Sequence, residues 1–128
     1  MYSWKCKICG RDFLDRHPPA DLTCDICKEG GIKYDGGKLR YDLIPVDALE
    51  ELVKVYTVGA QKYGDRNWEK GMEWGRIFGA IQRHLWAFWK GEDHDPETGI
   101  LHLSHACWGC MALIHYYNHQ IGEDDRKK

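Results

Sequence analysis

Residues 74–120 have the sequence WGRIFGAIQRHLWAFWKGEDHDPETGILHLSHACWGCMALIHYYNHQ, and this stretch decides the fold. Apolar residues recur at spacings of three and four over residues 74–90 and again over residues 100–120, which is typical of helices with one buried face. In the first of these helices the apolar stripe consists of Ile77, Ile81, Leu85 and Phe88. The turn sequence Asp95-Pro96-Glu97-Thr98-Gly99 separates them. The stretch therefore predicts two helices joined by a short acidic loop.

A third helix is predicted upstream, over residues 46–63, because Pro45 precedes it and Gly64 follows its end. Three helices in about 90 residues enclose only a thin core. The middle helix carries more aromatic surface than one such layer can cover: Trp74, Trp86, Phe88 and Trp89. We therefore expect a mainly α protein that buries some of this surface against another subunit, as a homo-oligomer.

Four of the six cysteines form two Cys-x-x-Cys pairs, Cys6 with Cys9 and Cys24 with Cys27. Two such hairpins can present four thiolates tetrahedrally to Zn²⁺, and metal binding then stabilises a module too small to fold on apolar burial alone. The spacing predicts a structural zinc ribbon, with redox-active cysteines as the alternative. Cys107 and Cys110 fall within the last predicted helix, where we expect them to be small buried side chains, with a redox pair or another metal site as the alternative.

The positions of these cysteine pairs and of a glycine-rich stretch divide the chain. We expect a zinc module over residues 1–31, a helical domain over residues 32–122 and a charged tail over residues 123–128. The 128 residues carry 18 Lys plus Arg against 20 Asp plus Glu, so the net charge of −2 provides no basic field for nucleic acid. No stretch approaches the ~18 apolar residues of a membrane helix, and Met1 begins no signal-peptide pattern. The sequence indicates a cytoplasmic protein that binds neither membrane nor nucleic acid.

Acids and imidazoles gather around the start of the last predicted helix. Four acids crowd into the preceding loop: Glu92, Asp93, Asp95 and Glu97. His102 and His105 are three residues apart, so both project from one helix face beside this loop, and His84 lies one helix earlier. Carboxylates favour Mg²⁺ or Mn²⁺, whereas imidazoles favour Mn²⁺, Co²⁺ or Zn²⁺. The spacing predicts a divalent-metal site, with an ordinary solvated loop as the alternative.

Basic residues in three other motifs point to a phosphate-bearing substrate: Lys38 and Arg40, Lys62 and Arg66, and Arg83. Glycines before Lys38 would let backbone amides approach oxyanions, although an ordinary turn has the same sequence. Asn67, beside Trp68, is a candidate for recognising a base. A divalent cation with Lys and Arg on phosphate oxygens is the usual arrangement for phosphoryl transfer.

Five motifs carry a family resemblance: Asp35-Gly-Gly-Lys-Leu-Arg-Tyr-Asp-Leu-Ile-Pro45, Gly59-Ala-Gln-Lys-Tyr-Gly-Asp-Arg-Asn-Trp68, Arg83-His84, Gly91-Glu-Asp-His-Asp95 and Thr98-Gly-Ile-Leu-His-Leu-Ser-His105. Together they make residues 33–119 resemble the phage-type dATP/dGTP diphosphohydrolases, relatives of the MazG-like all-α nucleotide pyrophosphohydrolases. The resemblance implies a helical bundle, active as a dimer or tetramer, that hydrolyses purine (deoxy)nucleoside triphosphates to the monophosphate and pyrophosphate with Mg²⁺ or Mn²⁺. It also implies a role in phage nucleotide metabolism, in the host cytoplasm. The zinc module lies outside the resemblance.

Under this interpretation the ligands of the catalytic cation are Glu92, Asp95, His102 and His105. The residues that accept the proton of the attacking water are Glu92, Asp93 or His84. The residues that neutralise the triphosphate are Lys38, Arg40, Lys62 and Arg83. MazG-like enzymes usually hold metal with two pairs of carboxylates, and here two histidines stand in place of the later pair.

Two other functions fit parts of the sequence. His94-Asp95 with His84 upstream resembles the metal phosphohydrolases of the His-Asp type, which would release inorganic triphosphate or monophosphate instead of pyrophosphate. A non-catalytic zinc-ribbon adaptor that binds nucleic acid or protein is the other alternative, and its DNA binding would depend steeply on salt.

Overall fold

The computed structural model describes residues 1–128 and divides them into two units, Met1–Leu43 and Ile44–Lys128. Residues 32–43 belong to the first unit rather than to the helical domain, which differs from the boundary expected after residue 31. The physical reason is a contact between segments that are distant in the sequence. The backbone N–H groups of Asp35 and Gly36 both donate to the carbonyl oxygen of Ile8 at 3.1 Å, and these bonds hold the glycine-rich segment against the cysteine module.

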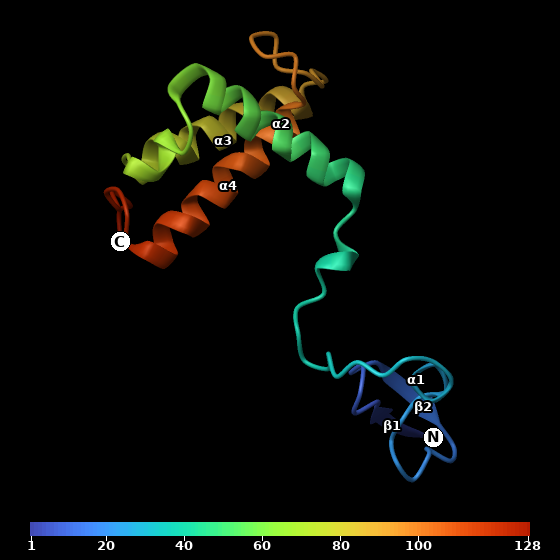
Figure 1. Cartoon of the computed structure of the whole chain (residues 1–128). Coiled ribbons are helices and arrows are strands. Elements are labelled where there is room, and N and C mark those ends of the chain that lie inside the picture. The colour runs from blue at the N-terminus through green and yellow to red at the C-terminus, as the bar shows by residue number, and fades with distance from the viewer. The chain divides into compact units, whose positions relative to one another are not determined.

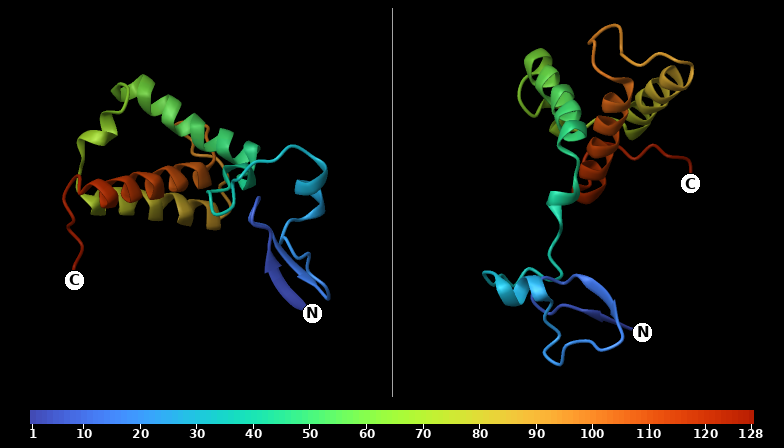
Figure 2. Two further views of the ribbon diagram at one scale, coloured as in Figure 1. Left: turned by 60° about the horizontal axis from the view of Figure 1, so that its bottom comes forward. Right: turned by 90° about the vertical axis from the view of Figure 1, so that its right-hand side faces the viewer.

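The helical unit contains α2 (Val46–Tyr63), α3 (Trp74–Trp89) and α4 (His102–His119), with a 3-10 turn at Asn67–Lys70. The three helices begin and end at most two residues from the bounds expected from the sequence. α3 and α4 run antiparallel and pack along their length, and α2 packs against α4 (Figures 1 and 2). α4 is therefore the central helix, and the prediction of a mainly α fold is confirmed.

The core of this unit lies between α3 and α4. Trp74, Ile77 and Ile81 of α3 are buried against small residues of α4: Ala106, Gly109 and Ala112. A Cβ at Gly109 would overlap the Ile81 side chain, so glycine at this position allows the two helices to approach closely. Tyr116, which is fully buried, closes one end of the core.

The expected buried faces of both helices are only partly correct. The prediction that Cys107 and Cys110 are buried is wrong, because α4 turns its small residues toward α3 and both thiols lie on the exposed side. The apolar stripe of α3 also ends early, since Leu85 is 39% exposed and Phe88 is only half-buried. The packed core is therefore concentrated in the first half of α3, and Leu85, Trp86 and Trp89 of the second half are exposed.

The exposed aromatic surface of α3 is smaller than its composition suggests. Trp74 is buried within its own chain, where its indole N–H donates to the carbonyl oxygen of Ile121 at 2.8 Å. Trp86 and Trp89 remain 58% and 77% exposed. None of the helices combines the length and the apolar content that crossing a membrane would require.

The charged C-terminal segment contacts the start of α3. Glu73, the N-cap residue of α3, makes no side-chain capping hydrogen bond. The carbonyl oxygen of Glu123 accepts a bond from Trp74 N–H at 2.9 Å, and the Asp125 carboxylate accepts one from Gly75 N–H at 2.7 Å. These acceptors satisfy N–H groups that a helix N-terminus leaves free. The segment is thus part of the helical unit rather than a loose tail.

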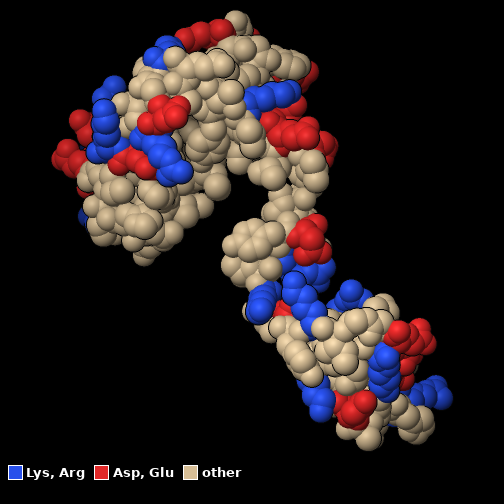
Figure 3. Space-filling view, in the orientation of Figure 1, with Lys and Arg blue, Asp and Glu red and all other residues tan.

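The first unit is built from β1 (Tyr2–Lys5), β2 (Asp12–Asp15), α1 (Asp25–Glu29) and a 3-10 turn at Tyr41–Leu43. The strands form an antiparallel hairpin with Tyr2 opposite Asp15. The buried cluster consists of Cys6, Ile8, Cys24 and Cys27. On the face shown in Figure 3, basic and acidic side chains of this unit are intermixed. A core made mainly of cysteines needs a source of stability beyond apolar burial.

Candidate functional site

Three histidines meet at one end of the α3–α4 pair. His84 lies near the end of α3, and His102 and His105 lie in the first turn of α4, so the antiparallel packing brings them together. His84 Nδ1 lies 2.8 Å from His102 Nδ1, and the His84 ring stacks on His105 with centroids 4.6 Å apart. His102 is only 4% exposed, and the other two are half-buried. We call these three residues the histidine cluster.

Two acids of the loop between α3 and α4 bind to this cluster. Glu92 Oε1 lies 2.6 Å from His102 Nε2, and Asp95 Oδ2 lies 3.5 Å from His105 Nε2. Thr98 links the second pair, because its hydroxyl donates to Asp95 Oδ2 at 3.1 Å and lies 2.7 Å from His105 Nε2. The imidazoles therefore face acids, not apolar packing.

Backbone hydrogen bonds hold this acidic loop in place. Asp95 N–H donates to Ile100 O at 2.8 Å, and Gly99 N–H donates to Asp95 O at 2.7 Å, which closes the turn. Gly99 has φ 73°, a left-handed conformation that favours glycine. His102 N–H donates to Asp93 O at 2.9 Å and so fixes the start of α4 to the loop. The sequence Asp-Pro-Glu-Thr-Gly thus sets where the carboxylates meet the histidines.

Burial and charge adjust the pKa values of the cluster. Burial lowers the pKa of His84, and the neighbouring His105 and His102 lower it further. Burial likewise lowers the pKa of His105, although Asp95 opposes this change. Burial alone would raise the pKa of Asp95, but hydrogen bonds from the Thr98 hydroxyl and the Glu97 N–H hold it below its ordinary value. Near neutral pH the site therefore contains an ionised Asp95 beside two neutral imidazoles.

Stability of the helical unit is expected to fall as the pH decreases below about 6.5, the ordinary pKa of histidine. Because the pKa values of His84 and His105 are lowered in the folded state, the unfolded chain binds more protons in acid. Their contribution to the free energy of unfolding is complete above about pH 6.5 and is lost as the pH falls toward the folded-state pKa values. The melting temperature, followed by far-ultraviolet circular dichroism without added metal, measures this loss.

The control for this pH dependence replaces histidines by a side chain that does not titrate. Replacing both His84 and His105 by glutamine should flatten the acid slope, whereas His17→Gln, at an exposed position of the first unit, should leave it unchanged. An unaltered slope in the double variant would contradict the assignment.

The four predicted metal ligands, Glu92, Asp95, His102 and His105, lie in two carboxylate–imidazole pairs, of which Glu92 with His102 is hydrogen-bonded and Asp95 with His105 is a contact at 3.5 Å. The one group in residues 1–128 whose ligand atoms all lie within 4.8 Å of one another is the four cysteines. Asp93, a predicted proton acceptor, has an exposed side chain and contributes its carbonyl oxygen to the loop.

Two of the predicted nucleotide-binding residues lie beside this site. Lys62, at the end of α2, places its Nζ 3.3 Å from Glu97 Oε1 and so reaches the acidic loop. Arg83 is exposed on α3 and precedes His84. Both cations are positioned by the helix that carries them, at the end of the bundle where the acids gather.

Arg66 and Asn67 are not brought to the histidine cluster. Arg66 pairs with Glu69 at 3.2 Å, and the 3-10 turn that Asn67 begins packs on the C-terminal half of α4 near Tyr116. Tyr116 lies about 16 Å along the helix from the last histidine of the cluster, at a rise of about 1.5 Å per residue.

Lys38 and Arg40 lie in the first unit. The backbone N–H of Lys38 donates to Asp35 O at 3.1 Å, so this motif forms an ordinary turn. Arg40 donates two hydrogen bonds to Asp42, at 2.8 and 2.7 Å, and the guanidinium lowers the pKa of that carboxyl.

Thr98 is a site residue that the sequence analysis missed. Its hydroxyl contacts both Asp95 and His105, so it fixes the orientation of a carboxylate and an imidazole together. A signal was available, because a threonine three residues after an aspartate in a turn commonly donates back to that carboxylate.

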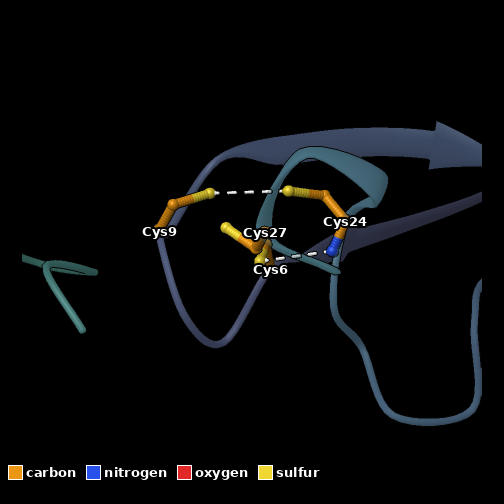
Figure 4. A group of neighbouring side chains, drawn as sticks. All are labelled: Cys6, Cys9, Cys24 and Cys27. Carbon is orange, nitrogen blue, oxygen red and sulfur yellow. Dashed lines mark hydrogen bonds between the residues drawn. The ribbon is translucent and has the colours of Figure 1, made fainter. Parts of the chain in front are cut away.

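The cysteine cluster of the first unit has the geometry of a metal site (Figure 4). The sulfurs of Cys6, Cys9, Cys24 and Cys27 lie within 4.8 Å of one another, and Cys9 Sγ is 3.8 Å from Cys24 Sγ. Four sulfurs placed ~2.3 Å from a tetrahedral Zn²⁺ are about 3.8 Å apart. The cluster can therefore hold a metal such as zinc.

Hydrogen bonds to sulfur support this conclusion. Burial alone would raise the pKa of Cys6, but N–H groups, including that of Cys24 at 3.4 Å, lower it to about 6. Burial and the neighbouring sulfurs raise the pKa of Cys27 to about 12. Without a cation the four sulfurs therefore cannot all be thiolates at neutral pH, and a bound metal would remove this repulsion.

Comparison with known proteins identifies the family. The family described as "dATP/dGTP diphosphohydrolase, N-terminal" matches residues 28–126, which include the whole histidine cluster. A relative named dATP/dGTP diphosphohydrolase, from Salmonella phage PMBT28, is 40% identical over 97 residues, which are 76% of this chain and 33% of the relative. The chain thus spans about a third of the length of the curated relative that it matches. No solved structure matches it. The chain belongs to the dATP/dGTP diphosphohydrolase family.

Proposed function

We propose that this chain hydrolyses purine (deoxy)nucleoside triphosphates, dGTP and dATP, to the nucleoside monophosphate and pyrophosphate. The observation that carries the proposal is the histidine cluster with Glu92 and Asp95 bound to it. It lies within the residues matched to a family whose name states this diphosphohydrolase activity.

The proposal includes a divalent cation, Mg²⁺ or Mn²⁺, held by Glu92, Asp95, His102 and His105. The support for this ion is the kind and location of the donors, because two carboxylates and two imidazoles lie in pairs at the same end of the helix pair. Mixed oxygen and nitrogen donors favour Mn²⁺ over Mg²⁺. When bound, the cation supplies charge that neutralises phosphate oxygens and lowers the pKa of the attacking water.

The chain's own residues would share the remaining work. The proton acceptor is Glu92, Asp93 or His84, all of which belong to the loop or to the cluster. Lys62 and Arg83 would neutralise the triphosphate at the bundle end. Lys38, Arg40, Arg66 and Asn67 remain nucleotide-binding predictions from the sequence.

Three further parts of the proposal concern the setting of the chain. Zn²⁺ in the cysteine cluster would be structural. The phage origin of the relative supports a role in phage nucleotide metabolism, in the host cytoplasm. The apolar stripe left uncovered on α4 supports a homo-oligomer, because Met111, Ile114 and Tyr117 are 46%, 57% and 61% exposed.

Product analysis tests the proposed reaction. Each of dGTP, dATP, GTP and ATP is incubated with the full chain and Mn²⁺ or Mg²⁺, and the products are separated by ion-exchange chromatography. We expect pyrophosphate and the nucleoside monophosphate, only when a divalent cation is present. Release of inorganic triphosphate or monophosphate would favour a His-Asp type phosphohydrolase instead. No product, together with DNA binding that weakens steeply with salt, would favour the adaptor.

A further inference from the structure

An open groove of about 840 Å³ runs along the C-terminal half of α3 and onto the loop that follows. We call it the α3 groove, and its lining residues are Gln82, Arg83, Trp86, Ala87, Lys90, Gly91 and Glu92. The core of the unit leaves this part of α3 uncovered, as the exposure of Leu85 and Trp86 indicates. A groove of this volume is within the range of small-molecule sites in proteins.

The lining of the α3 groove combines cationic side chains with one indole. Arg83, Trp86 and Lys90 follow one another at spacings of three and four, so one face of α3 presents a cation, an indole and a second cation. The ion pairs of the helical unit use other cations, namely Lys54, Lys62, Arg66, Arg126 and Lys128. Arg83 and Lys90 are therefore available to an anion.

An apolar protein surface would be a poor occupant of this groove. Covering Trp86 in that way would also remove two unpaired cations from water, and the desolvation of unpaired charges is costly. A ligand that carries an aromatic ring and several negative charges satisfies both kinds of side chain. Indoles stack on nucleobases of any kind, and guanidinium and ammonium groups bind phosphate oxygens.

One end of the α3 groove adjoins the histidine cluster through Glu92. Glu92 lines the groove, and its Oε1 lies 2.6 Å from His102 Nε2. Arg83 to Lys90 spans about 10 Å of helix, a length comparable to one nucleotide. A nucleotide lying in the groove would therefore have its phosphates within reach of the acids and imidazoles.

We infer that the α3 groove is the nucleotide-binding surface, with Trp86 stacked on the purine base and Lys90 on the polyphosphate. This inference rests on the proposed function, and it adds two substrate-binding residues that the motifs did not single out. It also separates the two exposed indoles of α3, since Trp86 lines the groove and Trp89 does not.

The test measures the binding of two ligands to the full chain by calorimetry with Mn²⁺ present. One ligand is α,β-methylene dGTP, which resists cleavage between the α and β phosphorus atoms, and the other is inorganic tripolyphosphate, which has no base. Trp86→Ala should weaken the nucleotide about tenfold or more, as expected for loss of base stacking, and leave tripolyphosphate unchanged. Lys90→Gln should weaken both ligands.

Matched controls are available on α3 and on the 3-10 turn at Asn67–Lys70. Trp89→Ala removes the other exposed indole of α3, and Lys70→Gln removes a surface cation away from the groove, so both should bind like the parent chain. Unchanged nucleotide binding in Trp86→Ala would overturn the inference, as would an equal loss of tripolyphosphate binding. If the parent chain hydrolyses dGTP while Trp86→Ala keeps its KM, the inference alone fails. If the parent chain yields no pyrophosphate, the proposed function is wrong, and the inference that rests on it is wrong with it.

Discussion

Replacing His102 by alanine is expected to reduce pyrophosphate release on the order of a hundredfold or more, while the helical circular dichroism stays unchanged. His102 links α3 to the acidic loop, since its Nδ1 contacts His84 and its Nε2 contacts Glu92. Losing even an outer partner of a metal ligand commonly costs 10–100-fold in activity, so losing a ligand should cost more. Initial rates with dGTP and Mn²⁺ provide the measurement.

Two companion variants make this prediction specific. His102→Gln keeps a polar side chain in the buried position and should also lose turnover, which separates a chemical role from a packing defect. His119→Ala removes an exposed histidine from the other end of α4 and should retain full activity. Robust hydrolysis by His102→Ala would remove the metal assignment.

The helices could be predicted because local signals mark both their periodicity and their ends. α2 occupies Val46–Tyr63, the range set by Pro45 and Gly64. The meeting of His102 and His105 with the acidic loop also follows from short-range geometry, since three residues in a helix and one tight turn separate the groups. Contacts of this kind depend on a few residues that are close in the sequence, so they can be predicted from it.

Other features depend on which helix face meets which neighbour, and periodicity does not determine this. The sequence pattern predicts that the apolar stripe with Cys107 and Cys110 is buried, yet α4 contacts α3 through Ala106 and Gly109. A hydrophobicity pattern does not reveal this interface, because helices that pack closely meet through small residues, which contribute little to the pattern. The sequence did not predict the α3 groove either. Trp86 is exposed because the packed core ends before it, and periodicity does not determine where the core ends.

The first unit shows the same distinction. Its cysteine spacing predicts the cluster, but the inclusion of residues 32–43 depends on a long-range contact. Gly36 approaches Gly10 so closely that a Cβ on Gly10 would lie 2.8 Å from the Gly36 Cα. Two glycines permit this contact, and a glycine-rich stretch resembles a linker when it is considered alone.

Removal of zinc is expected to unfold the first unit and leave the helical unit folded. The apparent binding free energy of structural Zn²⁺ is about 10–16 kcal/mol, which exceeds what a core of this size can contribute by apolar burial. Cys24→Ser should have the same effect, because it removes one of the four sulfurs of the cluster. Hydrogen exchange read by mass spectrometry should show loss of protection in residues 1–43 and unchanged protection in residues 44–128.

Cys110→Ser provides the matched control, since that thiol is exposed on α4 and lies outside the cluster. Native mass spectrometry of the parent chain should show one zinc ion, and Cys24→Ser should show none. Since residues 28–126 match the family and all four cysteines precede them, zinc removal should also spare dGTP hydrolysis if the helical unit suffices for chemistry. Protection in residues 1–43 that survives a strong chelator would mean that the hairpin is stable without metal, and the structural role of the ion would then be wrong.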